Sequence, residues 1–257
     1  SKSIIDEFPW LDPYWIHSEL IERYNILAHL NLSKGMNLLE VGCGAHVLTT
    51  IPLAYKVGPS GRIIAVDRSR WHAAKSLLEL TGFQSRVIPL KLNFKNFFVP
   101  FPIFDSVLCI HALRSFGADE NIVTILNKCA TTSSNICIAE SLSIANNEAQ
   151  NAHLEMYNLR AEIFQEISGK KDDYPYRTLD SLCKLLREAG FKKIKSKVIE
   201  LKLPHFLAVI PKRYLNKIKD AVKREKLERK WEEAYQKIKL HGEAHPPIAI
   251  ITAKSQN

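Results

Sequence analysis

LLEVGCGAHVLTT, residues 38–50, is an apolar run that ends in an acid and a valine, followed by a Gly-x-Gly turn and a segment of helical character. A glycine turn between a strand and a helix lets the backbone approach a ligand beside the helix N–H groups. Asp67 ends the next apolar run, 25 residues after Gly42. An acid at that point can accept hydrogen bonds from ribose hydroxyls. The stretch therefore predicts a site for a ligand that contains ribose.

The same loop argues against a dinucleotide. The fingerprint Gly-x-Gly-x-x-Gly needs a third glycine for the pyrophosphate, but position 47 is Val and position 46 is His. The phosphate loop Gly-x-x-x-x-Gly-Lys-Ser/Thr is absent as well. His46 itself either packs in the first turn after the loop or faces the ligand.

Short, β-branched apolar runs alternate with helical stretches over the first 140 residues, as in βαβ units. Two further runs near the C-terminus, one alternating between charged and apolar residues, favour an antiparallel pair. We predict an α/β fold with a doubly wound, mostly parallel seven-stranded sheet, helices on both faces, the last two strands antiparallel, and helical insertions. The strands are expected at residues 36–41, 62–66, 86–90, 104–110, 135–140, 192–203 and 246–254.

Several motifs together resemble a class I S-adenosylmethionine (SAM)-dependent methyltransferase, with a Rossmann-like domain of the methyltransferase type 11/25 kind. The resemblance runs from about Gly35 to Gly190 and includes the last two strands. It rests on LLEVGCGAH for the first motif, IIAVDRS for the ribose acid, LKLNF for the adenine border, FDSVLCIHAL for the strand beside the methyl group, and LLREAGFKKIKSKVIEL with PPIAIITAKS for the closing helix and strand pair.

The resemblance implies a set of cofactor-binding residues. Asn93 stands where the family often has Asp, and its carbonyl oxygen can still accept a hydrogen bond from the adenine amine. The implied set is Glu40 under the loop, Gly42 and Gly44 facing the methionine part with Cys43 between them, Asp67 at the ribose, Arg68 near the adenine, Asn93 and Phe94 bordering the adenine, and Ile110 near the sulfonium.

His111 follows the fourth predicted strand, at the edge where this fold places its ligands. Histidine titrates near neutral pH, so it suits a base that removes a proton from the acceptor. The alternative is a residue that begins a helix and shapes the pocket without moving a proton. His111 is the candidate catalytic residue.

Four residues are candidates for contact with the methyl acceptor: Tyr14, His153, Tyr157 and Tyr176. His153, Tyr157 and Arg160 share one face of a predicted helix, which is either the lining of a lid or a surface stripe. Tyr14 belongs to an aromatic N-terminal arm that either anchors to the core or closes over the cofactor. We expect residues 1–34 to cap the cofactor site, and residues 35–257 to form the SAM-binding domain with helical insertions at about 145–175 and 204–246.

The basic charge is concentrated near the C-terminus. Residues 191–240 hold 16 Lys/Arg and 6 Asp/Glu, a net of +10, while the whole chain has a formal net charge of +9. Acids are interspersed among these lysines at helical spacing, as in a solvated helix. The alternative is a surface that docks nucleic acid or another anionic partner.

We expect a methyltransferase that uses SAM and acts on a small-molecule or lipid-like acceptor. The alternatives are an RNA or protein methyltransferase that docks through the basic segment, and a non-catalytic SAM-binding protein. His241 and His245 lack a third ligand in the sequence, so no metal is expected. Five scattered cysteines, no signal-peptide pattern and no membrane-length apolar run favour a cytoplasmic protein.

Overall fold

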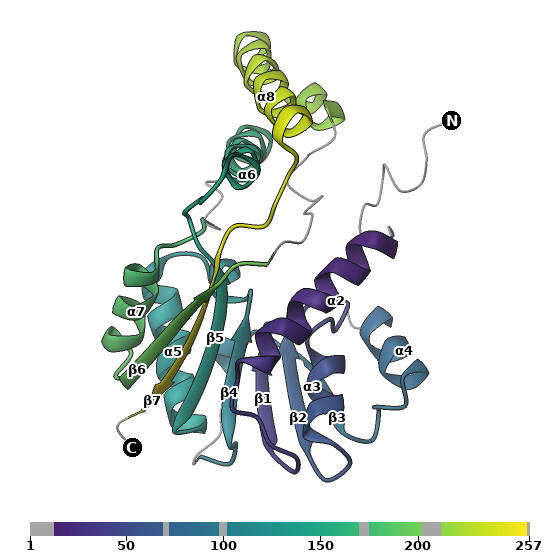
Figure 1. The fold of residues 1–257 in the computed structure, drawn as a ribbon, viewed down its shortest axis with the longest axis vertical. Helices are drawn as coiled ribbons and strands as arrows, with labels where there is room; N and C mark the ends of the chain where they lie inside the picture. The colour runs from purple at the N-terminus through teal and green to yellow at the C-terminus, as the bar shows by residue number, and fades with distance from the viewer. Residues whose placement is uncertain (1–12, 69–71, 98–101, 170–174, 202–211, 256–257) are drawn as a thin grey trace. The chain divides into compact units, whose positions relative to one another are not determined.

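A computed structural model describes residues 13–68, 72–97, 102–169, 175–201 and 212–255. Its central element is a seven-stranded sheet in the order β3-β2-β1-β4-β5-β7-β6 (Figure 1). The first five strands are paired in parallel and β6 pairs antiparallel with β7. The predicted fold is therefore confirmed. The strands are β1 (Asn37–Val41), β2 (Arg62–Asp67), β3 (Val87–Lys91), β4 (Ser106–Ile110), β5 (Asn135–Ser141), β6 (Lys192–Ile199) and β7 (Ile248–Lys254).

The central strands are buried along nearly their whole length. All five residues of β4 are buried, as are four of the five in β1. Such continuous apolar runs are what a parallel sheet covered on both faces requires. Four of the described helices pack on the sheet or on a helix that covers it: α3 packs on β2, α4 on β3, α7 on β6 and β7, and α5 on α7. They are α3 (Thr50–Val57), α4 (His72–Leu80), α5 (Asp119–Thr132) and α7 (Leu179–Glu188).

β6 is the edge strand that the alternating pattern predicts. Six of its eight residues are exposed, and four of these are lysines: Lys192, Lys193, Lys195 and Lys197. Lysines along an edge oppose pairing with a strand from another molecule.

The chain separates into two compact units. The sheet unit consists of Leu20–Glu140, Arg177–Ile199 and Ile248–Asn257. The helical unit consists of Ser1–Glu19, Ser141–Tyr176 and Glu200–Pro247, and so contains the described parts of both predicted insertions. Helix α2 (Pro13–Ala28) contributes residues to both units.

The helical unit is built around α6 (Glu148–Ser168), α8 (Ala221–His241) and the short 3-10 helix η4 (Lys212–Lys217). The side chain of Asn147 caps α6 and that of Asp220 caps α8, each by accepting backbone N–H bonds. The helices share an apolar core, which confirms the predicted helical character of these segments. Its buried members are Met156, Leu159, Ile163, Leu215, Ile218, Leu227, Trp231 and Ala234. No helix in the described part of the chain has both the length and the hydropathy to cross a bilayer.

Candidate cofactor pocket and active site

The loop after β1 needs glycine at two positions for different reasons. Gly42 has φ +82°, and a Cβ atom there would lie 2.5 Å from the Cβ of Ala112. Gly44 has φ +70°, and a Cβ atom there would meet nothing within 4 Å. Gly42 is thus required by conformation and packing, whereas Gly44 is required by conformation and borders open space. A ligand can therefore approach the backbone closely at Gly44.

Asp67, the last residue of β2, ties the end of its strand to this loop. The backbone N–H of Gly44 donates a hydrogen bond of 2.9 Å to Oδ2 of Asp67. The N–H of Gly42 donates to the carbonyl of Val66 at 2.8 Å. Because a carboxylate accepts several hydrogen bonds at once, Asp67 can hold both the loop and a ribose hydroxyl.

A pocket of about 450 Å³ opens at the carboxyl ends of the parallel strands, within the sheet unit. Its size is typical of small-molecule sites, and its glycine cradle and carboxylate suit the amino-acid and ribose parts of SAM. Seven of the ten candidate cofactor and catalytic residues line it: Gly42, Gly44, Asp67, Arg68, Asn93, Phe94 and His111. The lining does not include Glu40, Cys43 or Ile110, all three of which are buried. Sequence reasoning missed several other lining residues, among them Lys95, Ser115, Phe116 and Asn121.

Glu40 is a fully buried carboxyl in β1. Burial raises the pKa of Glu40 to about 7, although a hydrogen bond from Thr50 and the charge of Arg23 lower it. The Thr50 hydroxyl donates to Oε2 of Glu40 at 2.6 Å. The pKa of this carboxyl group is therefore close to neutral pH.

Glu140, in β5, is a second buried acid near the strand ends that sequence reasoning missed. Its Oε1 accepts a 2.6 Å hydrogen bond from the N–H of Leu113, the first residue of the 3-10 helix η3 (Leu113–Phe116). Burial raises the pKa of Glu140, and the charge of Arg114 opposes the shift. An acid near the end of an apolar strand, the signal that identified Asp67, is also present here.

The predicted adenine border is formed by the 3-10 helix η2 (Phe94–Asn96) and the residue before it. Oδ1 of Asn93 caps η2 by accepting the N–H of Lys95 at 3.1 Å. Phe94 is buried, and its ring stacks on that of Phe97 with centroids 5.2 Å apart. The Lys95 side chain donates to Asn121 of α5. These bonds fix a wall of mixed apolar and amide character.

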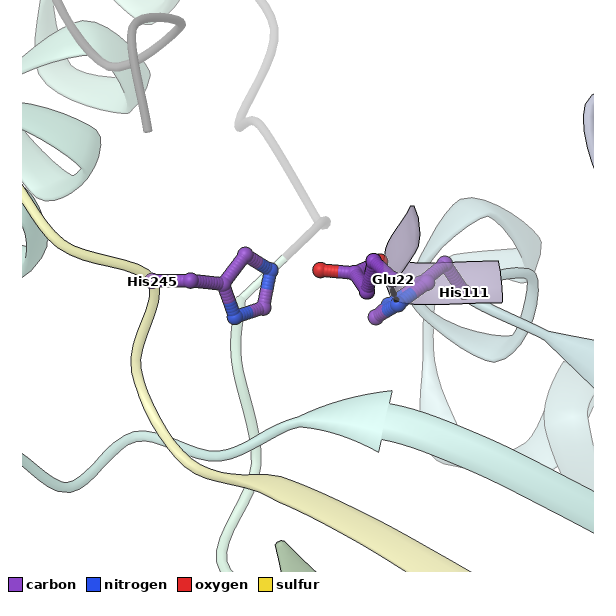
Figure 2. Close-up of side chains that lie close together, drawn as sticks. All are labelled: Glu22, His111 and His245. Atoms are coloured by element: carbon purple, nitrogen blue, oxygen red, sulfur yellow. Dashed lines mark ion pairs between the residues drawn. The ribbon is translucent and has the colours of Figure 1, made fainter. Parts of the chain in front are cut away.

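His111 directly follows β4 and has a left-handed backbone, with φ +52°. Its N–H donates to the carbonyl of Ala139 at 2.7 Å. Nε2 of its ring lies 2.8 Å from Oε1 of Glu22, and both side chains are 5% exposed (Figure 2). Glu22 also pairs with Arg23, its neighbour in α2. Glu22 was missed because the sequence predicts only an amphipathic helix there, in which charged residues are normally exposed.

Three of the four candidate acceptor residues cluster in the helical unit. His153 is fully buried, so a surface stripe is the wrong interpretation for this residue. Its Nδ1 lies 2.8 Å from Oε1 of Glu243 and its Nε2 lies 3.2 Å from the hydroxyl of Tyr176. The rings of Tyr157 and Tyr176 stack with centroids 4.0 Å apart. Helical spacing predicted that His153 and Tyr157 share a face, and Glu243 is a partner that the sequence did not indicate.

The remaining candidates are placed differently. The backbone of Tyr14 lies in α2, but its side chain is outside the described residues. His46 is exposed and is not part of the pocket lining, so it does not pack in the core. The Arg160 guanidinium lies over the ring of Phe164, 5.6 Å from its centroid. His245 is buried, with Nδ1 2.7 Å from the carbonyl of Pro246.

Comparison with known proteins identifies the family of this chain. The model of a family described as a methyltransferase domain matches residues 14–196. Protein arginine N-methyltransferase 1 of Saccharomyces cerevisiae is 32% identical over 117 residues, which cover 42% of this chain and 33% of that protein. The match thus spans a third of that relative's length.

Solved structures share the fold at low identity. A cyclopropane-fatty-acyl-phospholipid synthase-like protein from Lactobacillus casei has a TM-score of 0.75 and 17% identity, covering 93% of this chain and 91% of that one. A SAM-dependent methyltransferase from Aquifex aeolicus has a TM-score of 0.52 and 18% identity, covering 74% of this chain and 88% of that one. The chain therefore belongs to the methyltransferase domain family, with the class I fold and the cofactor, SAM, that its sequence motifs predict.

Proposed function

We propose that this protein transfers the methyl group of SAM to a small-molecule or lipid-like acceptor. Bound SAM supplies an activated methyl group on a good leaving group. The protein's task is then mainly to align the acceptor with the methyl carbon and to exclude water. In this proposal the loop at Gly42 and Gly44 holds the methionine part, Asp67 the ribose, and Asn93 with Phe94 the adenine.

His111 is the proposed base. It lines the pocket directly after β4, and its backbone bond to Ala139 holds it there. A base is needed when the acceptor atom loses a proton as it gains the methyl group. His111 is well placed for this task because its ring is almost fully shielded from bulk water.

The observation that carries the choice of a small acceptor is the pairing of α6 with α8. Three lysines of α8 are bonded to glutamates of α6, at 2.9, 2.6 and 2.7 Å. The pairs are Lys223–Glu166, Lys230–Glu162 and Lys237–Glu155. These contacts neutralise part of the basic segment, and the core beneath it is apolar. The segment thus resembles a structural helix pair more than a cationic surface for nucleic acid.

Methylation of protein arginine is a second candidate, because of the local identity to the yeast arginine methyltransferase. That likeness extends over less than half of this chain, so it supports a shared cofactor-binding part more than a shared acceptor. Methylation of RNA, or binding of SAM without catalysis, would use the same cofactor pocket.

The test has two stages. Calorimetry with SAM and with S-adenosylhomocysteine measures cofactor binding, and failure to bind either one contradicts the proposal. Transfer of labelled methyl from SAM is then compared across small-molecule, lipid, RNA and arginine-containing peptide fractions. We expect label in the small-molecule or lipid fraction. Label in RNA or peptide alone would overturn the proposed acceptor while retaining the enzyme, and binding without transfer would indicate the non-catalytic role.

A further inference from the structure

Helix α2 buries two charged residues in the sheet unit, next to apolar residues. Glu22 and Arg23 are 4% and 8% exposed, while Ile26 and Leu27, one turn later, are almost completely buried. Ionised side chains are rarely buried unless they are paired, since removing a charge from water is costly. Glu22 contacts both Arg23 and His111. A purely structural helix would place apolar residues at these positions, so the buried pair needs another explanation.

His111 is held through both its backbone and its side chain. Its backbone adopts a left-handed conformation that is uncommon for residues other than glycine, and the N–H bond to Ala139 fixes it. The ring meets Glu22 through Nε2 (Figure 2). Strained backbone of this kind persists where the surroundings determine it, and is often found at functional sites. The backbone bond fixes the position of the residue, and the contact with Glu22 restrains its ring.

We propose that Glu22 is the positioning residue for His111 and that the acceptor is therefore a hydroxyl or an amine, whose reacting atom bears a proton. This inference rests on the proposed function, in which His111 is the base. In this proposal Nε2, which lies 2.8 Å from Oε1 of Glu22, is the protonated nitrogen, and Nδ1 is the nitrogen that accepts a proton. The acceptor atom forms its bond to the methyl carbon as the carbon–sulfur bond breaks and its electron pair stays on sulfur. The acceptor's proton passes to Nδ1.

A carboxylate does two things that a neutral side chain would do less well. It fixes the tautomer of the imidazole, and it stabilises the imidazolium that forms when the proton arrives. Arg23, from the same helix, balances the charge of Glu22 before the reaction. An acceptor with no proton to lose, such as a thioether or a tertiary amine, would gain nothing from this pair. The pair thus favours an acceptor that loses a proton on methylation, which the proposal takes to be a hydroxyl or an amine.

The first test needs no acceptor. Protein labelled with ¹⁵N-histidine and saturated with S-adenosylhomocysteine is examined by long-range ¹H–¹⁵N NMR, with the His111 signals assigned from His111→Ala. We expect the tautomer protonated at Nε2 in the parent and a mixture in Glu22→Met. The same single tautomer in Glu22→Met would overturn the positioning role. Calorimetry with S-adenosylhomocysteine shows that each variant is folded, and Glu79→Gln, an exposed acid on α4, is the matched control.

The second test uses the fraction that accepts labelled methyl. Glu22→Gln should lower kcat by about 10- to 100-fold with KM for SAM nearly unchanged, and Glu22→Asp should recover part of the loss. A change in KM alone would indicate a merely structural role. So would an equal loss of kcat in Glu22→Gln and Glu22→Asp. The ¹³C shift of a transferred [¹³C]methyl group then identifies the atom that received it. Oxygen or nitrogen supports the inference, whereas carbon or sulfur overturns the acceptor class. If no fraction is labelled, the proposed function fails while the NMR result still decides the pairing.

Discussion

The sheet unit and the helical unit place their charged groups differently. In the sheet unit, Glu40 and Glu140 lie buried in strands and burial raises the pKa of both. Their neighbours line a pocket, so the unfavourable burial is concentrated around a ligand site. In the helical unit, the ion pairs join α6 to α8 over an apolar core. The buried acids of the sheet unit thus lie near the pocket, whereas the exposed ion pairs of the helical unit mainly join two helices.

The largest expected effect comes from removing the largest side chain of the helical core, which tests whether the helical unit and the pocket are independent. Trp231 is buried among α6 and α8 residues and stacks on Tyr235, with ring centroids 4.8 Å apart. Trp231→Ala should cost about 3–5 kcal/mol through the lost burial and the cavity. Hydrogen exchange at the α6 and α8 amides measures the loss. Affinity for S-adenosylhomocysteine should be kept, because the whole pocket lining lies in the sheet unit.

Trp231→Phe serves as the control, since it keeps a ring in the core. If the alanine variant lost its ligand affinity while the phenylalanine variant kept it, the pocket would depend on the helical core and the division of roles would be wrong.

The next largest effect is expected in the loop of the sheet unit. Gly42→Ala should destabilise the protein by about 2–5 kcal/mol, because its Cβ would overlap that of Ala112 and its φ is positive. Gly44→Ala should cost only about 1 kcal/mol, since open space surrounds the new methyl group. Urea unfolding compares the two, and equal losses would show that backbone strain alone decides the loop sequence.

The buried Glu40 makes the stability of the sheet unit depend on pH near neutrality. The folded protein keeps the Glu40 proton up to about pH 7, while the unfolded chain releases it near the usual glutamate pKa of 4.5. This contribution to stability is therefore fully present below about pH 4.5 and is lost as the pH rises through about 7.

Glu40→Gln should remove this slope, which is at most about 1.4 kcal/mol per pH unit. The measurement is the free energy of unfolding of both proteins without ligand, from about pH 5 to about pH 8. The parent should lose stability relative to the variant as the pH rises. A difference that stays constant with pH would mean that Glu40 titrates alike in the folded and unfolded chains.

The smallest effect belongs to the surface pairs of the helical unit. Lys230 and Glu162 have side chains 42% and 50% exposed. Because solvent screens such pairs, Lys230→Met should cost less than about 1 kcal/mol. A double-mutant cycle with Glu162→Gln isolates the coupling in urea unfolding. A coupling well above this size would mean that ion pairs, more than the apolar core, hold the two helices together.

The sequence predicted the sheet unit well because its signals are local. The runs around Leu39, Val66 and Leu108 are short and apolar, and the glycine turn marks the end of one of them. These signals specify strand, loop and strand-end acid within a few residues. The helical character of α6, α7 and α8 was also predicted, since the residue spacing that indicates a helix is equally local.

Partnerships across long stretches of chain were not predictable. Glu22 meets His111, and Glu243 meets His153, across about 90 residues in each case. Nothing in the local pattern of α2 distinguishes the buried Glu22 from an exposed acid. The residue spacing of α6 predicted that His153 and Tyr157 share a face, but it did not predict that His153 is buried. Tertiary packing decides these contacts, and a single sequence does not reveal it.

The strand order has a consequence for synthesis on the ribosome. β7 is the sheet neighbour of β5, but β5 ends at Ser141 and β7 begins only at Ile248. At a synthesis rate of about 5–20 residues per second, the edge of β5 remains uncovered for roughly 5–20 s before β7 is made. During this interval the nascent chain has an unpaired apolar strand edge of the kind that chaperones bind. The lysines of β6, made before β7, then arrive at the outer edge of the finished sheet.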